Sequence, residues 1–363
     1  MNEEERGLTG ADPSKEKAPL RRRLRRGIVV MTILLVAVYT YMMATAGGRN
    51  LLDALYDLQP HLLFLPVLAT LLSYVTMSLS YSGITRAAGS TIGNLDMLRI
   101  TFVANTANYV LPTGGLSGFA LRMVMLNKKG ISAGRAVLIS FTQTLLTNLM
   151  LMVFIVYGLI YLVLTRSLDA ITVVLVGVVI TGLTAFLGGC LAMVYRESLR
   201  TRFLASASAL TERLLHRAGR FERFSARAER FFVHIDEGMQ FFASQPRAMI
   251  GPLIWIFLDW VFTIGVLYVA FYSIGSSVTY GQVVVAFSVG IVFAVVSFVP
   301  GGVGILEVAL SEMFESGGVP KAESVLAILI FRISFYVIPV ILSVVLARGA
   351  FAEVEPEMTE EVA

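Results

Sequence analysis

The chain has 363 residues, of which 56% are hydrophobic and 15% are charged, and its mean hydropathy is +0.76. Soluble domains carry about 25% charged residues, so this composition excludes a soluble globular protein and indicates an integral membrane protein. The apolar runs are too long and continuous for the alternating strands of a membrane barrel, so they predict an all-α fold. One cysteine and three scattered histidines exclude a disulfide framework within the chain and argue against a metal cluster, so we expect no metal site.

The N-terminal segment, residues 1–26, is polar and ends in closely spaced arginines. We expect it to form a disordered basic tail in the cytoplasm, because positive charge beside a membrane span favours that side. The uncharged run 27–48 is long enough to cross the membrane and predicts the first span. A loop around residues 49–57 then lies outside, and a second helix at about 61–82 returns to the cytoplasm.

A segment at 97–126 carries cations on both flanks, which the same rule places in the cytoplasm. We therefore expect this segment to enter the membrane, turn at a break near 112–118 and leave on the side from which it came. Two uncharged runs, 136–165 and 170–195, each predict a further span. With the preceding helices they complete a predicted first membrane half, residues 27–195.

Two polar segments are expected outside the membrane. Residues 196–247 hold ten arginines interleaved with leucine and phenylalanine, a pattern typical of amphipathic helices at an anionic inner leaflet. A solvated arginine-rich linker between two membrane halves explains the same pattern equally well. The acidic end, residues 349–363, is expected to form a disordered cytoplasmic tail.

The second predicted membrane half covers residues 248–348. Its first helix extends to about 274, and an uncharged run at 282–299 leads into a break near 300–307. Several glutamates and one lysine follow the break, so no positive charge places this segment in the cytoplasm. We expect it to enter from the outside and return there. A last span, about 323–347, ends the half.

The two breaks share a proline followed by glycines. They contain Pro112, Gly114, Gly115 and Gly118 in the first half, and Pro300, Gly301, Gly302 and Gly304 in the second. Proline and glycine interrupt a helix, and the freed backbone groups must be buried in protein or line a polar cavity. Paired broken helices of opposite orientation are typical of inverted-repeat transporters with a site near the midplane. We therefore predict about six full spans, two re-entrant hairpins and two inverted repeats.

Charged residues inside the apolar runs indicate where that site lies. A charge at the bilayer centre costs roughly 2.5–3.5 kcal/mol on insertion scales, so Arg332 is expected to pair with Glu307 or Asp259. Such a pair either fixes helix register or lines a path for a charged headgroup, with the arginine fork on its phosphate. Nearby amides either bond across helices or line the same path. The candidate headgroup-binding residues are Arg122, Arg332, Glu307, Asp259, Asn105 and Asn108.

Enzyme signatures are missing from the sequence. It contains no phosphate-binding loop of the G-x-x-x-x-G-K-[ST] type, no H-E-x-x-H zinc motif and no G-x-S-x-G nucleophile elbow. We therefore expect no catalytic activity, no cofactor and no nucleic-acid partner.

The two broken-helix motifs resemble those of the lysylphosphatidylglycerol synthase/flippase transmembrane family, the membrane part of the multiple peptide resistance factor. The first is Asn105-x-x-Asn108, then Gly114-Gly115-Leu116-Ser117-Gly118 and Leu121-Arg122. The second is Pro300-Gly301-Gly302-Val303-Gly304-x-x-Glu307, then Gly318-Val319-Pro320 and Arg332. The resemblance covers roughly residues 25–350. Related branches carry an arginine and a glutamate in the first motif, where this chain has Thr113 and Ser117 or Gly118, so a carboxylate role is not carried over there.

The resemblance implies translocation of a phospholipid, typically an aminoacylated phosphatidylglycerol, between leaflets of the cell membrane. Bifunctional members carry a synthase domain after the membrane part, and a chain ending at Ala363 is not expected to transfer amino acids. Two alternatives stay open on the sequence. One is a membrane scaffold for a separately encoded lipid-modifying transferase, and the other is a transporter of small soluble anions. The oligomeric state is not predicted.

Overall fold

The structure is a computed structural model that describes residues 36–110, 116–165, 170–217, 221–296 and 302–352. These residues form helices joined by short turns, and no strand occurs among them, which confirms the predicted all-α class. The first part of the chain forms α2 (Gly48–Tyr56), α3 (Phe64–Ala87), α4 (Asn94–Val110), α5 (Leu116–Lys128), α6 (Ala133–Thr165) and α7 (Ala170–Tyr195). The second part forms α8 (Glu197–Arg217), α9 (Phe221–Ser244), α10 (Pro246–Ser273), α11 (Tyr280–Val296), α12 (Ile305–Glu315), α13 (Lys321–Arg332) and α14 (Ile338–Ala352).

Five described helical segments are long and apolar enough to cross a membrane, so the chain is a multi-pass membrane protein. They are Pro60–Ala87, Ala133–Thr165, Val176–Tyr195, Pro246–Ser273 and Lys321–Leu346. Each lies at a position where the sequence predicts a span. The predicted first span, 27–48, is described only from Val36 onward, as the helical segment Val36–Ala46. The count of six full spans therefore stays a prediction.

One sequence-based expectation about this region is wrong. The segment expected to be a loop, residues 49–57, lies in and just after α2, which begins at Gly48 and ends at Tyr56. Leu51 and Ala54 lie three residues apart, so they share one apolar face of the helix. Ala54 is buried in the core and Leu51 packs against the same cluster. Packing of this face, rather than the nearby charges, decides the local structure.

Each predicted break lies between two short helices. In the first half, α4 has 17 residues and α5 has 13; in the second half, α11 has 17 and α12 has 11. None reaches the roughly 20 residues that a full crossing needs. A long helix precedes each short pair, α3 or α10, and a long helical stretch follows it, α6 or α13–α14. The order of elements around each break is therefore the same, although the first half also contains the segment Val36–Ala46, α2 and α7.

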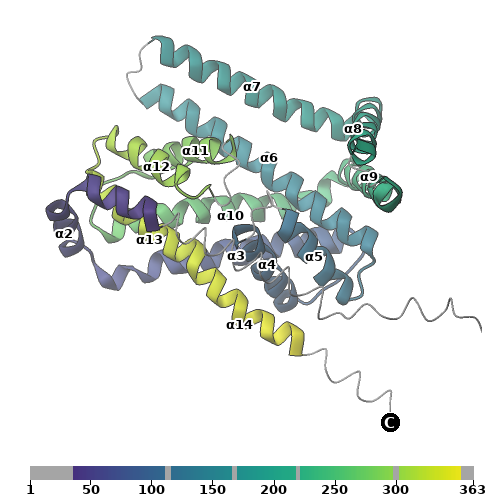
Figure 1. Cartoon of the computed structure of the whole chain (residues 1–363), viewed down its shortest axis with the longest axis horizontal. Helices are drawn as coiled ribbons and strands as arrows, with labels where there is room; N and C mark the ends of the chain where they lie inside the picture. Colours follow the sequence, from purple (N-terminus) through teal and green to yellow (C-terminus); the bar gives the residue numbers. More distant parts are fainter. Residues whose placement is uncertain (1–35, 111–115, 166–169, 218–220, 297–301, 353–363) are drawn as a thin grey trace, which may run out of the picture.

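The two halves pack into each other rather than side by side. The long helices α3 and α10 pair along their length at the centre of the molecule (Figure 1). Gly83 allows this close approach, because a Cβ there would lie 3.0 Å from the ring of Pro252 on α10. The remaining contacts are reciprocal: α4 packs against α14, and α11 packs against α6. Each short helix before a break is thus supported by a long helix of the opposite half.

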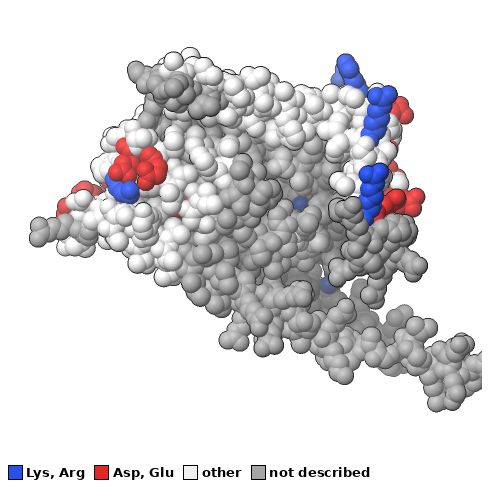
Figure 2. Space-filling view, turned by 45° about the horizontal axis from the view of Figure 1, so that its top comes forward, with Lys and Arg blue, Asp and Glu red and all other residues white. Residues whose placement is uncertain are grey.

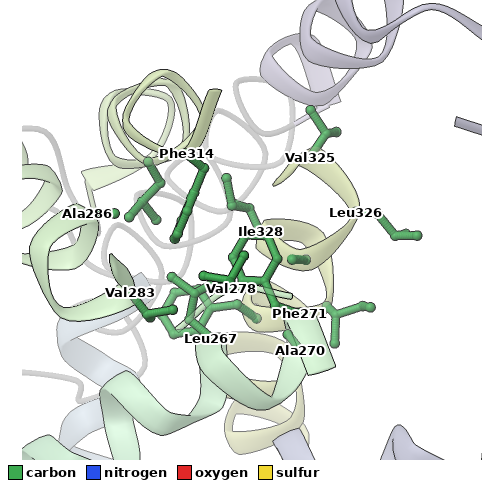
Figure 3. Close-up of a cluster of buried hydrophobic side chains, with 14 of the residues drawn as sticks. Leu267, Ala270, Phe271, Val278, Val283, Ala286, Phe314, Val325, Leu326 and Ile328 are labelled. Carbon is green, nitrogen blue, oxygen red and sulfur yellow. The ribbon is translucent and has the colours of Figure 1, made fainter. Parts of the chain in front are cut away.

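The larger of two apolar clusters among the described residues lies mainly in the second half. It joins Phe271 on α10, Val283 on α11 and Phe314 on α12 to Ile328 on α13, as Figure 3 shows. Phe271 and Phe314 are in ring contact, with centroids 4.4 Å apart. This dense packing holds the helices on both sides of the second break in fixed positions.

Charge is distributed toward two ends of the molecule. Figure 2 shows lysine, arginine and acidic side chains gathered over α8–α9 at one end and near α12–α13 at the other, whereas the described surface between them on this face is mostly uncharged. At the α12–α13 end, Lys321 forms ion pairs with Glu312 and Glu315. The α7 helix lies along the outer side of α6, and its most apolar stretch is not buried by protein. An apolar surface of this extent fits a lipid environment.

Candidate functional site

The second break leads directly into a buried ion pair. Gly304 adopts a positive φ of 88°, a conformation that glycine tolerates, and it caps the start of α12. Its N–H donates a 2.8 Å hydrogen bond to Oε2 of Glu307. The other oxygen, Oε1, lies 2.8 Å from Nε of Arg332 on α13, and both side chains are buried. The predicted pairing of Arg332 is therefore with Glu307, and Pro300 and Gly301 lie outside the described residues.

An aromatic ring also contacts Arg332. Its guanidinium carbon lies 4.3 Å from the ring centre of Tyr336, one turn further along the chain. After Arg332 the helix widens into a π-helical segment, Ile333–Val337, which contains Tyr336. Such segments often occur at functional positions. The carbonyl of Gly302 accepts a long hydrogen bond of 3.5 Å from the guanidinium. The segment Val36–Ala46 also reaches this site, because a Cβ on Gly304 would lie 3.1 Å from Val38.

The side-chain amide of Asn108 connects the two short helices on either side of the first break. The side-chain oxygen of Asn108, on α4, accepts a 2.6 Å hydrogen bond from the N–H of Gly118 on α5. Ser117 donates to the carbonyl of Ala107 over 2.9 Å. Gly118 permits this contact, because an added Cβ would lie 2.5 Å from Cγ of Asn108 and would also clash with the carbonyl of Ala104. Asn108 thus joins the two short helices, while Pro112, Gly114 and Gly115 lie outside the described residues.

Arg122 lies two turns into α5 and differs from Arg332 in its partners. Only 3% of it is exposed, and its guanidinium carbon lies 4.2 Å from the ring centre of Tyr81 on α3. It donates one long hydrogen bond, 3.4 Å, to Oδ1 of Asn105, whose amide nitrogen contacts the sulfur of Met77. Its Nε has no acceptor, and no carboxylate of the described residues forms an ion pair with it. Within the described part of the chain, Arg122 is therefore a buried cation without a counter-ion.

Asp259 lies at the α3–α10 contact and is held by hydroxyl groups. It accepts a 2.5 Å hydrogen bond from Ser73, whose oxygen is 3.1 Å from that of Thr263. The structure does not pair Asp259 with Arg332, the alternative left open by the sequence. Its partner Ser73 precedes Tyr74 on α3, and Tyr81, which stacks against Arg122, lies two turns further along the same helix.

Together these groups form a buried polar row through an otherwise apolar bundle. Tyr74 and Tyr109 both lie in ring contact with Phe335, and the ring centre of Tyr109 is 4.7 Å from that of Tyr336. The row comprises Arg122, Tyr81, Asp259, Tyr74, Tyr109, Tyr336, Arg332 and Glu307. The sequence analysis identified its charged members but none of its four tyrosines. A tyrosine in an apolar span carries a hydroxyl that needs a partner, and that signal was available in the sequence.

A multi-pass helical protein with broken short helices and buried charges belongs to the class of membrane proteins with polar intramembrane sites. Comparison of the sequence with protein families narrows this class. The family described as "Lysylphosphatidylglycerol synthase TM region" matches residues 27–343. The chain belongs to this family, as its two motifs predict.

Individual relatives extend the comparison. The chain is 21% identical over 337 residues to the UPF0104 membrane protein PH1989 of Pyrococcus horikoshii, and the match covers 88% of this chain and 94% of that protein. It is 28% identical over 103 residues to the phosphatidylglycerol lysyltransferase of Staphylococcus haemolyticus, which covers 28% of this chain and 12% of the relative. The corresponding protein of Staphylococcus aureus is 28% identical over 94 residues, 11% of its length. The match to these lysyltransferases is therefore restricted to a small part of them.

Proposed function

We propose that this protein moves an anionic or aminoacylated phospholipid between the leaflets of the cell membrane, as a flippase or scramblase. The observation that carries the proposal is the buried polar row, above all the uncompensated charge of Arg122. An isolated buried charge costs several kcal/mol in a protein, so its presence needs a compensating ligand. A lipid phosphate supplies that compensation while the acyl chains stay in the bilayer.

The side chains of the row suggest how a headgroup is handled. A guanidinium fork binds two phosphate oxygens at once, which favours Arg122 and Arg332 as phosphate contacts. Asn105 and Asn108 add amides beside the first break, and Asp259 and Glu307 supply negative charge for an amine of the headgroup. The sequence contains no nucleotide-binding motif, so we propose movement down a gradient or coupled to an ion.

The proposed architecture is an inverted repeat of residues 27–195 and 248–348. Two features support it: the same order of long and short helices in both halves, and the reciprocal packing of α4 on α14 and of α11 on α6. In such a repeat the two breaks face opposite leaflets. We propose that the α8–α9 end and both termini are cytoplasmic, since exposed arginines, among them Arg202, gather there.

The proposal is tested with purified protein in liposomes that contain acyl-labelled fluorescent phosphatidylglycerol, its lysyl ester or phosphatidylcholine. Dithionite quenches label in the outer leaflet only, so a protein that moves lipid exposes more than half of the label. We expect Arg122→Gln and Arg332→Ala to slow this exposure while Arg202→Gln, the same kind of change at an exposed site on α8, does not. Wild-type liposomes that protect the inner label for every lipid, with and without an ion gradient, would contradict the proposal.

A second candidate function is a scaffold for a separate lipid-modifying enzyme. It is favoured by a cleft of about 600 Å³ between α8 and α9, lined by apolar and acidic side chains. The cleft includes Leu204, Phe232, Glu212 and Glu229. A scaffold predicts that substitutions in this cleft abolish lipid modification in cells without changing lipid movement in liposomes.

A further inference from the structure

The two buried arginines of the polar row are in different electrostatic states. Arg332 is paired with Glu307 at 2.8 Å, so this site is close to neutral. Arg122 has an aromatic face and an amide as neighbours, and none of these carries a full negative charge. Its Nε is buried and has no acceptor. In the first half, Arg122 therefore has no anionic partner among the described residues. In the second half, Glu307 occupies the corresponding position beside Arg332.

Glu307 has the properties of an internal substitute for a ligand. Its carboxylate places Oε1 beside Nε of Arg332, and carboxylate and phosphate are the two groups that a guanidinium fork matches. The N–H of Gly304 holds the second oxygen of Glu307 at the start of α12, where the helix dipole also favours negative charge. An incoming phosphate that reaches Arg332 must therefore displace a carboxylate, whereas at Arg122 it displaces nothing of like charge.

We propose that the resting protein binds one phosphate-bearing lipid headgroup, at Arg122, and that Glu307 blocks a second, equivalent site at Arg332. The inference rests on the headgroup site of the proposed function and deepens it by assigning the bound anion to one half. The carboxylate of Glu307 sets the number of bound headgroups. Its separation from Arg332 is the step that allows a headgroup to be passed from the first half to the second.

The number of ligands bound tests the inference without any transport. Purified protein in detergent is titrated with short-chain phosphatidylglycerol, and the bound lipid is counted by native mass spectrometry and by calorimetry. We expect one lipid per wild-type chain, two per Glu307→Gln chain and none at the same concentrations for Arg122→Gln. Glutamine keeps the shape and an oxygen for the N–H of Gly304, so the change removes mainly the charge. The double variant should bind one lipid.

Three results decide against the inference. They are an unchanged number of lipids in Glu307→Gln, a wild-type site that survives in Arg122→Gln, and equal competition by inorganic phosphate. The last would assign Arg122 to a soluble anion, because a lipid site should prefer phosphatidylglycerol by roughly tenfold or more through contacts beyond the phosphate. Where Arg122→Gln fails to fold, Arg122→Lys replaces it and should retain one site of lower affinity, since lysine keeps the charge without the fork.

Together, the number of lipids bound and the movement of lipid in liposomes distinguish the failure of one proposal from the failure of the other. If no lipid moves in liposomes but the numbers bound are one and two as expected, the proposed function fails and the anion site stands. If lipid moves but Glu307→Gln still binds one headgroup, translocation stands and the role assigned to Glu307 fails. Glu312→Gln provides a control, because that carboxylate is exposed at the α12–α13 end, where it pairs with Lys321, and should not change the number bound.

Discussion

Replacing Gly118 by alanine tests whether the first break depends on close contact between α4 and α5. An added Cβ would lie 2.5 Å from Cγ of Asn108 and would clash with the carbonyl of Ala104. Overpacking of this kind costs about 1–3 kcal/mol, and loss of the hydrogen bond from the Gly118 N–H adds about 0.5–1.5 kcal/mol. The higher helix propensity of alanine returns up to about 1 kcal/mol. We expect a net loss of roughly 1–3 kcal/mol.

The measurement is thermal unfolding in detergent, with Gly182→Ala as a matched control. Gly182 lies in α7, and a Cβ there would meet nothing within 4 Å. The same substitution at that position should leave the melting temperature unchanged or raise it, because only helix propensity acts. Gly118→Ala should lower it by several degrees. Equal stability of the two variants would refute the close contact and, with it, the geometry that places Arg122 beside Asn105.

Two further predictions concern the ion pair and the orientation of the halves. Arg332→Ala should destabilise the protein by roughly 3–5 kcal/mol, because it leaves Glu307 buried without its partner. Adding Glu307→Gln to this variant should recover part of that loss. If denaturant unfolding shows that the losses of the two single variants simply add, the two side chains are not coupled. Single cysteines at positions 128 and 320, both exposed, should be labelled from opposite sides of the membrane in a Cys190→Ser background. Labelling of both by an impermeant maleimide in intact cells would exclude the inverted repeat.

The sequence predicts the long helices well because one physical signal dominates them. Uncharged runs at 136–165 and 170–195 correspond closely to α6 and α7, since lipid leaves no alternative to a helix for a long apolar segment. The α2 helix was missed because its apolar face is short and charged residues surround it. The reciprocal packing of the halves was also out of reach, because the partner of a membrane helix depends on side-chain shape rather than on hydropathy.

The charged part of the site could be predicted, but its pairing could not. A charge in an apolar run stands out by its cost, which is why Asp259, Glu307 and Arg332 were identified. The choice between the two carboxylates depends on tertiary structure. The break turns the start of α12 so that Glu307 faces α13, whereas Asp259 faces Ser73 on α3. The lack of a carboxylate partner for Arg122 among the described residues likewise becomes visible only in the tertiary structure.

The interlocked halves lead to a prediction about assembly. Helix α4 packs on α14, α11 packs on α6, and α3 and α10 cover each other, so part of the buried surface of each half is covered by the other half. Cleaving the chain between α8 and α9, after Arg217, divides it into two such halves. Fragments expressed together should co-purify and unfold in one transition, because the contacts that complete each hairpin come from the other fragment. Each fragment alone should aggregate or be degraded. If either were monodisperse alone and melted at the temperature of the pair, the reciprocal contacts would contribute little, and each hairpin would have to be stabilised within its own half.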